Sequence, residues 1–241
     1  MTSAAFSPAG DSTLVVRFGS EISQSVNRRV ALFTGNVERA GLKAVRELIP
    51  TFCTVSVVYD PMVTTYEKLV RQLTSLLPGA EGAAAGGRTV HVLPVCYGGE
   101  FGADLPFVAK HAGLTEQEVI DLHSGRDYLI YMLGFLPGFS YLGGLDSKLH
   151  TPRLSSPRTK IPAGSVGIGG EQTGVYPLDS PGGWQLIGRT PVRPYDPNRE
   201  PAILYSAGEY IRFSPVSREE YDRIEREIAA GTYQHTVLQE V

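Results

Sequence analysis

Residues 134–190 read GFLPGFSYLGGLDSKLHTPRLSSPRTKIPAGSVGIGGEQTGVYPLDSPGGWQLIGRT and hold nearly half of the chain's 27 glycines. Prolines interrupt the same stretch, and no G-X-Y period runs through it, which excludes a collagen-like structure. Short β-rich runs between glycine and proline predict short strands joined by tight turns. This segment therefore favours a closed β-barrel or a sandwich.

The turn-rich pattern begins near Gly125 and continues almost to the last helix. Ahead of it, residues 103–124 predict two short helices, the second with Thr115 and Glu118 in capping-box spacing. Ser217 and Glu220 have the same spacing and predict the start of a terminal helix. The strand-like runs are 128–133, 165–168, 174–176, 184–189, 202–205 and 210–213.

The first 80 residues predict an α/β unit of a different kind. One helix is expected to be capped by Ser20, and a second to begin with a capping box at Thr64 and to stop at Pro78–Gly79. The resulting order β-α-β-β-α lacks one strand of a ferredoxin-like unit. The three strands of this unit are expected at 12–18, 45–49 and 53–59.

The glycine- and alanine-rich stretch 79–87 predicts a linker, because it has no large apolar side chain to anchor it. A strand at 88–95 either completes the first unit or opens the second. We expect an α+β protein with a ferredoxin-like N-terminal domain at 1–86 and a β-barrel domain at 87–241.

Composition excludes several classes of protein. Apolar residues are 42% and charged residues 20%, which is ordinary globular usage and excludes general disorder. With 22 basic and 25 acidic residues the net charge is −3, so no nucleic-acid partner is expected. The apolar run 128–136 is far shorter than a membrane span, and residues 1–10 lack a signal-peptide pattern. We expect a cytoplasmic protein with no membrane partner.

The common catalytic and metal-binding motifs are absent from the sequence. GxxxxGK[ST], GxGxxG and GxSxG do not occur, and the five histidines have no metal-ligand spacing. Only Cys53 and Cys96 are present, too few for a disulfide framework or a zinc site. We expect no bound metal.

Candidate chemistry is concentrated in the glycine-rich middle of the chain. Arg153, Arg158 and Arg189 are permanently charged and suit carboxylate or phosphate, although surface arginines are the simpler interpretation. Backbone N–H groups of 164–170 suit an anion-binding nest, but the spacing of the glycines favours a tight turn or a bulge in a barrel strand. Trp184 beside two glycines suits a flat wall of a ligand site, and the alternative is a core residue.

Four motifs together resemble the family of the 5-oxoprolinase B subunit, which also includes the sporulation-kinase inhibitor KipI and proteins named allophanate hydrolase subunit 1. The resemblance covers nearly the whole chain, and Ala103 is one departure, where the family usually has proline. The motifs are PVCYGGEFGADL (94–105), YMLGFLPGFSYLGGL (131–145), TPR…PR…IPAGSVGIGGEQTGVYPL (151–178) and SPGGWQLIGRTP (180–191).

The resemblance implies that the C-terminal domain is a cyclophilin-like β-barrel. It implies one component of a hydrolase, inactive alone, that opens 5-oxo-L-proline to L-glutamate with the A subunit and a KipA-like C subunit of 5-oxoprolinase. ATP, with magnesium, would be a co-substrate, and no tightly bound cofactor is expected. The same motifs leave open an inhibitor of a sensor histidine kinase, or half of an allophanate hydrolase or urea carboxyltransferase.

Within the matched motifs, residue type suggests the site. Arg153, Arg158 and Arg189 are expected to act as catalytic cations, with Gln172 as a donor to developing charge. Phe135, Phe139 and Tyr141 add aromatic surface. The residues expected to bind substrate are Phe139, Tyr141, Gly164, Ser165, Gly169, Gly170, Tyr176, Ser180, Gly182, Gly183 and Trp184.

Overall fold

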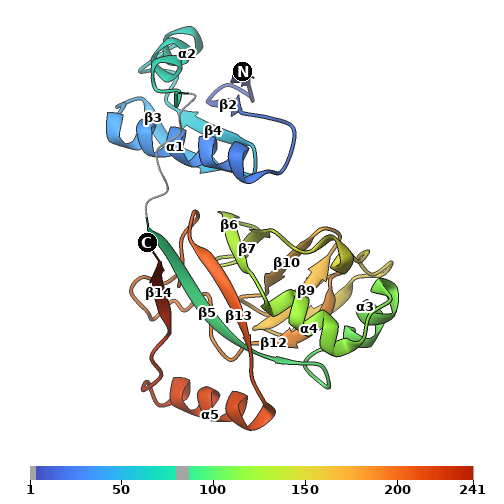
Figure 1. Ribbon diagram of the computed structural model, residues 1–241. Helices are drawn as coiled ribbons and strands as arrows, with labels where there is room; N and C mark the ends of the chain where they lie inside the picture. The colour runs from blue at the N-terminus through green and yellow to red at the C-terminus, as the bar shows by residue number, and fades with distance from the viewer. Residues whose placement is uncertain (1–3, 80–86, 241) are drawn as a thin grey trace. The chain divides into compact units, whose positions relative to one another are not determined.

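The computed structural model describes residues 4–79 and 87–240. The chain divides into two compact units, Met1–Gly86 and Gly87–Val241 (Figure 1). Each unit has a hydrophobic core of its own. Most of the predicted linker at 79–87 lies outside the described residues. Within the described ranges, no helix is both long and apolar enough to cross a membrane.

Unit 1 is a four-stranded antiparallel sheet with two helices, α1 (Gln24–Ala40) and α2 (Tyr66–Ser75). Along the strand Thr54–Tyr59, alternate side chains are buried, and they share one core with apolar residues of both helices. The strands in sheet order are β1 (Ala5–Pro8), β2 (Thr13–Arg17), β4 (Thr54–Tyr59) and β3 (Val45–Pro50).

The fourth strand of this unit comes from the N-terminus. β1 pairs antiparallel with β2, so that Phe6 lies opposite Val16. The missing strand of the ferredoxin-like pattern is therefore supplied before the first predicted strand. The strand that begins at Arg88 belongs to unit 2.

Two helix caps differ from the sequence prediction. Ser23, not Ser20, caps α1, because its hydroxyl accepts the N–H of Val26 at 3.3 Å. Thr65, not Thr64, caps α2, and its hydroxyl accepts the N–H of Lys68 at 3.4 Å. α2 also ends at Ser75, before the predicted stop. In both cases a neighbouring hydroxyl residue offers an equivalent cap, and only the path of the preceding chain selects between them.

Unit 2 is a nearly closed β-barrel. Seven strands form a continuous ladder, and its two end strands, β10 and β7, also lie side by side. The long strand β5 carries the short strand β14 (Val237–Glu240) as well. The ladder order is β10 (Gln172–Val175), β9 (Ser165–Gly169), β12 (Gln185–Arg189), β5 (Arg88–Tyr97), β13 (Tyr210–Pro215), β6 (Asp127–Leu133) and β7 (Ser140–Gly143).

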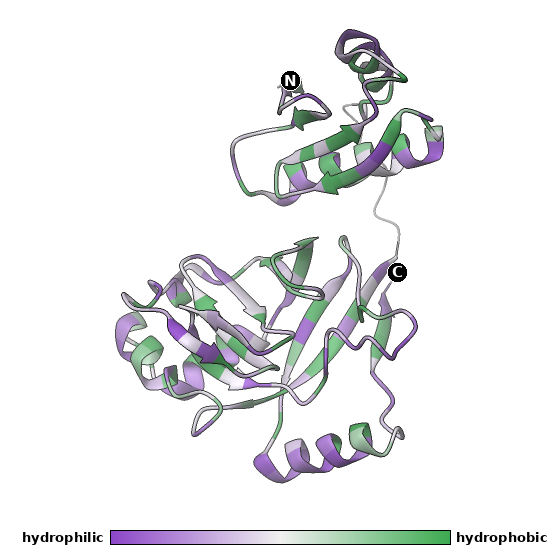
Figure 2. Cartoon of the chain, turned by 180° about the vertical axis from the view of Figure 1, so that it is seen from behind, coloured by the Kyte–Doolittle hydropathy of each residue, from purple (hydrophilic) through white to green (hydrophobic). Residues whose placement is uncertain are grey.

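Unit 2 also contains helices, which lie between its strands in the sequence. The predicted capping boxes begin α4 and α5: Thr115 and Glu118 bond reciprocally, and the hydroxyl of Ser217 accepts the N–H of Glu220. α5 is largely hydrophilic (Figure 2) and buries Tyr221 and Ile224. The helices are α3 (Leu105–Ala112), α4 (Glu116–Ser124), the 3-10 turn η1 (Ser147–Leu149) and α5 (Arg218–Ala229).

The predicted strand at 202–205 is wrong. Ile203 forms only an isolated bridge with Tyr195. Arg199 holds this segment as a loop, because its guanidinium donates to the carbonyls of Arg193, Pro194, Pro201 and Ala202. Backbone hydrogen bonds within the loop, from Leu204 to Pro194 and from Asp196 to Ala202, add to these contacts, so the β-rich composition does not produce a strand here.

A buried histidine, His123, forms hydrogen bonds with two side chains in the barrel interior. His123 Nε2 lies 2.8 Å from the hydroxyl of Thr173, and Nδ1 lies 2.7 Å from the hydroxyl of Tyr97. Thr173 donates its own proton to the carbonyl of Gly167 at 3.0 Å, so Nε2 of His123 carries the proton and Nδ1 accepts from Tyr97. Burial lowers the pKa of His123 to about 3. This histidine is therefore neutral and structural.

Candidate functional site

An aromatic pocket of about 140 Å³ opens on unit 2, and most of its lining residues are among those expected to bind substrate. Its side chains come from the β6–β7 loop, from β7, from the segment after η1 and from the region around the small strand β11 (Ser180–Gly182), which pairs with β8 (Arg158–Ile161). The lining residues are Phe135, Phe139, Tyr141, Arg153, Tyr176, Pro181, Gly182, Gly183 and Trp184.

Phe139 is the centre of this aromatic pocket. Its ring lies 5.1 Å from that of Tyr141, 5.6 Å from that of Tyr176 and 5.7 Å from that of Trp184, each between centroids. The interplanar angles of 65–76° are edge-to-face, an arrangement that places ring edges against negatively polarised faces. The four rings therefore form a fixed apolar wall.

Trp184 is both a core residue and a pocket wall. It is only 5% exposed and belongs to a small apolar cluster with Phe139, Tyr176, Ile161 and Leu186. This cluster is separate from the main barrel core. The core interpretation of Trp184 is therefore correct, and its role as a wall of a ligand site stays a prediction that its place in the pocket lining favours.

The glycines make room for these rings. A Cβ added at Gly169 would lie 2.3 Å from the indole Cδ1 and Nε1 of Trp184, and one at Gly174 would lie 3.2 Å from Cζ3. A Cβ at Gly182 would lie 2.6 Å from the hydroxyl oxygen of Tyr176. A glycine-rich chain is thus what allows bulky aromatic rings to lie flat on the strands beneath them.

The segment Gly164–Gly170 is strand structure and not an open nest. Its strand, β9, is paired on one side with β10 and on the other with β12. Gly164 donates its N–H to the carbonyl of Tyr176, and Gly170 donates to the carbonyl of Thr151. The pocket does not include Gly164, Ser165, Gly169, Gly170, Gln172 or Ser180.

Of the three arginines, Arg153 alone lines the pocket. It is exposed, its Cζ lies 5.8 Å from the centroid of the Trp184 ring, and no acidic side chain pairs with it among the described residues. A guanidinium over an aromatic wall offers its donors to a carboxylate or phosphate that enters the pocket.

Arg158 does not line the pocket but forms hydrogen bonds that hold the backbone of Trp184 in place. Nη2 donates to Asp104 Oδ1 at 2.8 Å, and Nη1 donates to the carbonyl oxygen of Trp184 at 3.3 Å. The other carboxylate oxygen of Asp104 accepts the N–H of Leu186 at 2.6 Å. Together, Asp104 and Arg158 hold the backbone on both sides of Gln185 and so fix where the indole lies.

Arg189 lies elsewhere on unit 2. Its Nε donates to the carbonyl of Ala163 at 3.0 Å, and its Cζ lies 5.6 Å from the centroid of the Phe101 ring. The structure therefore does not bring the three expected catalytic cations together.

Phe135 and Pro181 line the pocket but were not among the expected substrate-binding residues. Phe135 has a φ of 67° and is the one non-glycine residue with positive φ in the described chain. It is also 67% exposed, so neither local preference nor burial accounts for this backbone conformation. Strain of this kind is typical of functional sites. The signals in the sequence are its aromatic side chain within the matched motif and its position two residues before Pro137–Gly138.

Burial raises the pKa of Tyr176, while the Trp184 backbone N–H and the charges of Arg153 and Arg158 oppose the shift. Its hydroxyl therefore remains protonated near neutral pH. Among the residues described, no group of three histidine, cysteine or carboxylate side chains could hold a metal ion. The pocket offers apolar walls, the hydroxyls of Tyr141 and Tyr176, and the guanidinium of Arg153, which has no acidic partner among the described residues.

Comparison with known proteins shows to which family the chain is related. The family described as carboxyltransferase domain, subdomain C and D, matches residues 4–205. The B subunit of 5-oxoprolinase from Bacillus subtilis is 44% identical over 90% of this chain and 95% of its own length. The one from Escherichia coli O157:H7 is 57% identical over 51% of this chain and 56% of its own length.

Solved structures agree on the fold. TTHA0988 superposes with a TM-score of 0.75 and 38% identity over 85% of this chain, which spans only 40% of that protein. The urea amidolyase of Kluyveromyces lactis gives a TM-score of 0.81 at 20% identity, over 98% of this chain and 16% of that one. The chain therefore belongs to the 5-oxoprolinase B-subunit family, within the carboxyltransferase-domain proteins.

Proposed function

We propose that this chain is the B subunit of an ATP-dependent 5-oxoprolinase, which acts with the A and C subunits to open 5-oxo-L-proline to L-glutamate. Three curated relatives bear the name of the 5-oxoprolinase B subunit, and the chain covers 95% of the Bacillus subtilis protein. We further propose that the chain is inactive without its partners.

The observation that supports this function is the aromatic pocket with its single unpaired cation. 5-Oxoproline is a small, nearly flat ring that carries one carboxylate. Phe139 and Trp184 would pack against the ring, and Arg153 would bind the carboxylate. Tyr176 would remain available as a hydrogen-bond donor to the lactam oxygen.

The chemistry explains the need for ATP. Amide resonance makes a lactam carbonyl a poor electrophile. Transfer of the γ-phosphoryl group to the lactam oxygen gives an imidate, which water attacks at the same carbon. The ring C–N bond then breaks with phosphate release, and nitrogen gains protons to become the amine of glutamate. ATP, with magnesium, is the co-substrate of the complex.

Within that reaction we assign substrate recognition to this chain. Arg158 is already paired with Asp104, and neither Arg158 nor Arg189 lines the pocket, so neither is placed to touch a substrate bound there. Arg158 instead acts as a positioning residue for Trp184. Arg153 is the residue that would touch substrate.

The test is co-expression with the A subunit and a partner that resembles the C subunit, followed by measurement of 5-oxoproline-dependent ATP hydrolysis. Arg153→Gln should raise the KM for 5-oxoproline at least about tenfold, because it removes a charged hydrogen bond. Arg226→Gln, on the exposed face of α5, is the matched control and should be unchanged. A normal KM in Arg153→Gln would refute the assigned role.

A carboxyltransferase function is the second candidate, because the matching family is described by that reaction. Urea amidolyases are 28–30% identical over about half of this chain, which spans only 8% of each of them. A complex that carboxylates urea and ignores 5-oxoproline would favour this candidate. A well-formed complex with neither activity would favour the interaction role of a KipI-like inhibitor.

A further inference from the structure

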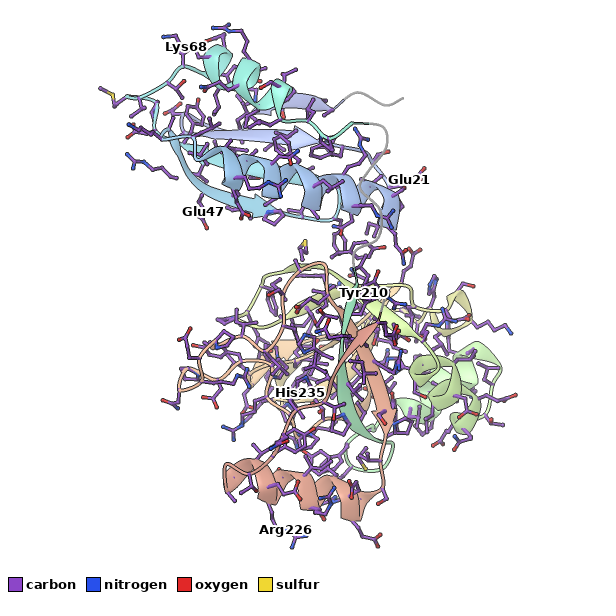
Figure 3. The ribbon with its side chains drawn as sticks, turned by 60° about the vertical axis from the view of Figure 1, so that its left-hand side comes forward. Glu21, Glu47, Lys68, Tyr210, Arg226 and His235 are labelled. Atoms are coloured by element: carbon purple, nitrogen blue, oxygen red, sulfur yellow. The ribbon has the colours of Figure 1, made fainter. Side chains whose placement is uncertain are left out.

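A second group of polar side chains lies in unit 2 outside the aromatic pocket. His91 on β5 is 5% exposed; its Nε2 lies 2.9 Å from Glu209 Oε2, and its Nδ1 lies 3.1 Å from Nε2 of His235. The two imidazole rings are stacked with centroids 5.3 Å apart. His235, labelled in Figure 3, lies in the segment that joins α5 to β14.

For a neutral His91, the hydrogen bonds determine which nitrogen of each imidazole carries the proton. Glu209 Oε2 also accepts the N–H of Ser206 at 2.7 Å, so the carboxylate is the acceptor and His91 donates from Nε2. Nδ1 of His91 then accepts from Nε2 of His235. This leaves a bare lone pair on Nδ1 of His235. That atom is buried and has no hydrogen-bond partner within the described chain.

His235 lines a pocket of about 190 Å³. Val192, Leu204 and Ile228 supply apolar walls, and Arg193 and Asp196 supply opposite charges. Asp196 uses Oδ1 to accept the N–H of Asn198, and its other oxygen is unpaired among the described residues.

The two arginines of this second pocket differ in what they can offer. Arg199 also lines it, but its guanidinium already donates four hydrogen bonds to backbone carbonyls. The guanidinium of Arg193 has no partner in the described part of the chain, and this side chain is exposed. Arg193, Asp196 and His235 therefore line a small, partly apolar space, and each has a polar group without a hydrogen-bond partner among the described residues.

We propose that this second pocket, the His235 pocket, binds a small α-amino acid. The ammonium group would donate to Nδ1 of His235 and to Asp196, and the carboxylate would bind Arg193. The apolar walls would contact the ligand's side chain. An unpaired buried acceptor is costly in free energy, and a bound ammonium would remove that cost.

The state of the imidazoles is consistent with this ligand. Burial, the largest cause, lowers the pKa of His235 to about 4. The ring is therefore neutral at neutral pH and able to accept. Glu209, at the far end of the chain of hydrogen bonds, holds His91 in the tautomer that orients His235.

Calorimetric titration of the full chain with L-alanine, L-leucine and L-glutamate tests the proposal. At least one of the three should bind with a Kd below about 10 mM. Asp196→Asn and Arg193→Gln should each weaken binding about tenfold. Arg226→Gln is the control and should have no effect. N-acetylated and methyl-ester forms of the same amino acid should bind more weakly, since each removes one charge.

The site is located by two further measurements. In ¹⁵N-histidine NMR, the Nδ1 signal of His235 should shift on binding, and 5-oxo-L-proline, which lacks an ammonium, should leave it unchanged. Arg153→Gln should not affect amino-acid binding. The proposal is overturned if none of the three amino acids binds, if Arg153→Gln abolishes binding, or if the His235 signal does not move. Failure of the oxoprolinase function would leave these results unaffected.

Discussion

Replacing Gly169 with alanine should displace Trp184 and distort the aromatic pocket. The added Cβ would lie 2.3 Å from the indole, and an ordinary contact needs about 3.5 Å, so the two groups must separate by about 1.2 Å. Neither group can move away easily. Gly169 lies in β9, which is hydrogen-bonded to a strand on each side, and Trp184 is only 5% exposed. Overpacking at such a site costs about 1–3 kcal/mol.

Trp184 is the chain's only tryptophan, so its fluorescence reports this site alone. Urea unfolding followed by that signal should show a lower midpoint in Gly169→Ala, with the m-value unchanged. Gly183→Ala is the matched control. Its Cβ would make only ordinary contacts at 3.7 Å or more, and Gly183 has no positive φ, so stability should change by less than about 0.5 kcal/mol. A midpoint and emission spectrum in Gly169→Ala equal to those of the wild type would refute the packing argument.

Three other predictions address the support of the pocket, the barrel interior and a helix cap. Arg158→Gln and Asp104→Asn should each destabilise unit 2, and a double-mutant cycle should give a coupling of about 1 kcal/mol; additive effects would contradict a direct pair. Folding lowers the pKa of His123. Its contribution to the free energy of unfolding is therefore fully present above the unfolded-state pKa near 6.5 and is lost as the pH falls toward about 3. The share of His123 in the stability of unit 2 should fall by about 2 kcal/mol from pH 7 to pH 5, and His123→Gln should make the urea-midpoint profile less steep by that amount. Thr115→Ala should cost about 1 kcal/mol, measured in the same way, and no change would show that the cap is dispensable.

Local patterns predicted local structure well. The Thr115–Glu118 and Ser217–Glu220 spacings identify two helix starts because a cap depends on residues within one turn. β1 was not predicted, since four residues ending in proline carry no strand signal of their own and are held by pairing with β2. The 202–205 run failed for a different reason, because its backbone pairs with the loop segment 194–196 and with Arg199 and not with a barrel strand.

Many residues of the candidate site could be predicted from the sequence, but the ion pairs among the residues around it could not. Aromatic residues and Arg153 come together as the motifs suggest. That Arg158 pairs with Asp104, 54 residues earlier, depends on the closed barrel and leaves no trace in local spacing. The glycines, which suggest an anion nest in sequence, serve in the structure to seat the indole.

Recognition of 5-oxoproline by the aromatic pocket is the central claim, and the fluorescence of Trp184 tests it directly. Titration of the wild-type chain with 5-oxo-L-proline should give a saturable change in emission, because the ring would pack on the indole. Arg153→Gln should weaken that binding at least about tenfold, while Arg226→Gln should leave it unchanged. An emission that stays constant in the wild type up to about 10 mM ligand, or equal binding in Arg153→Gln, would contradict the account.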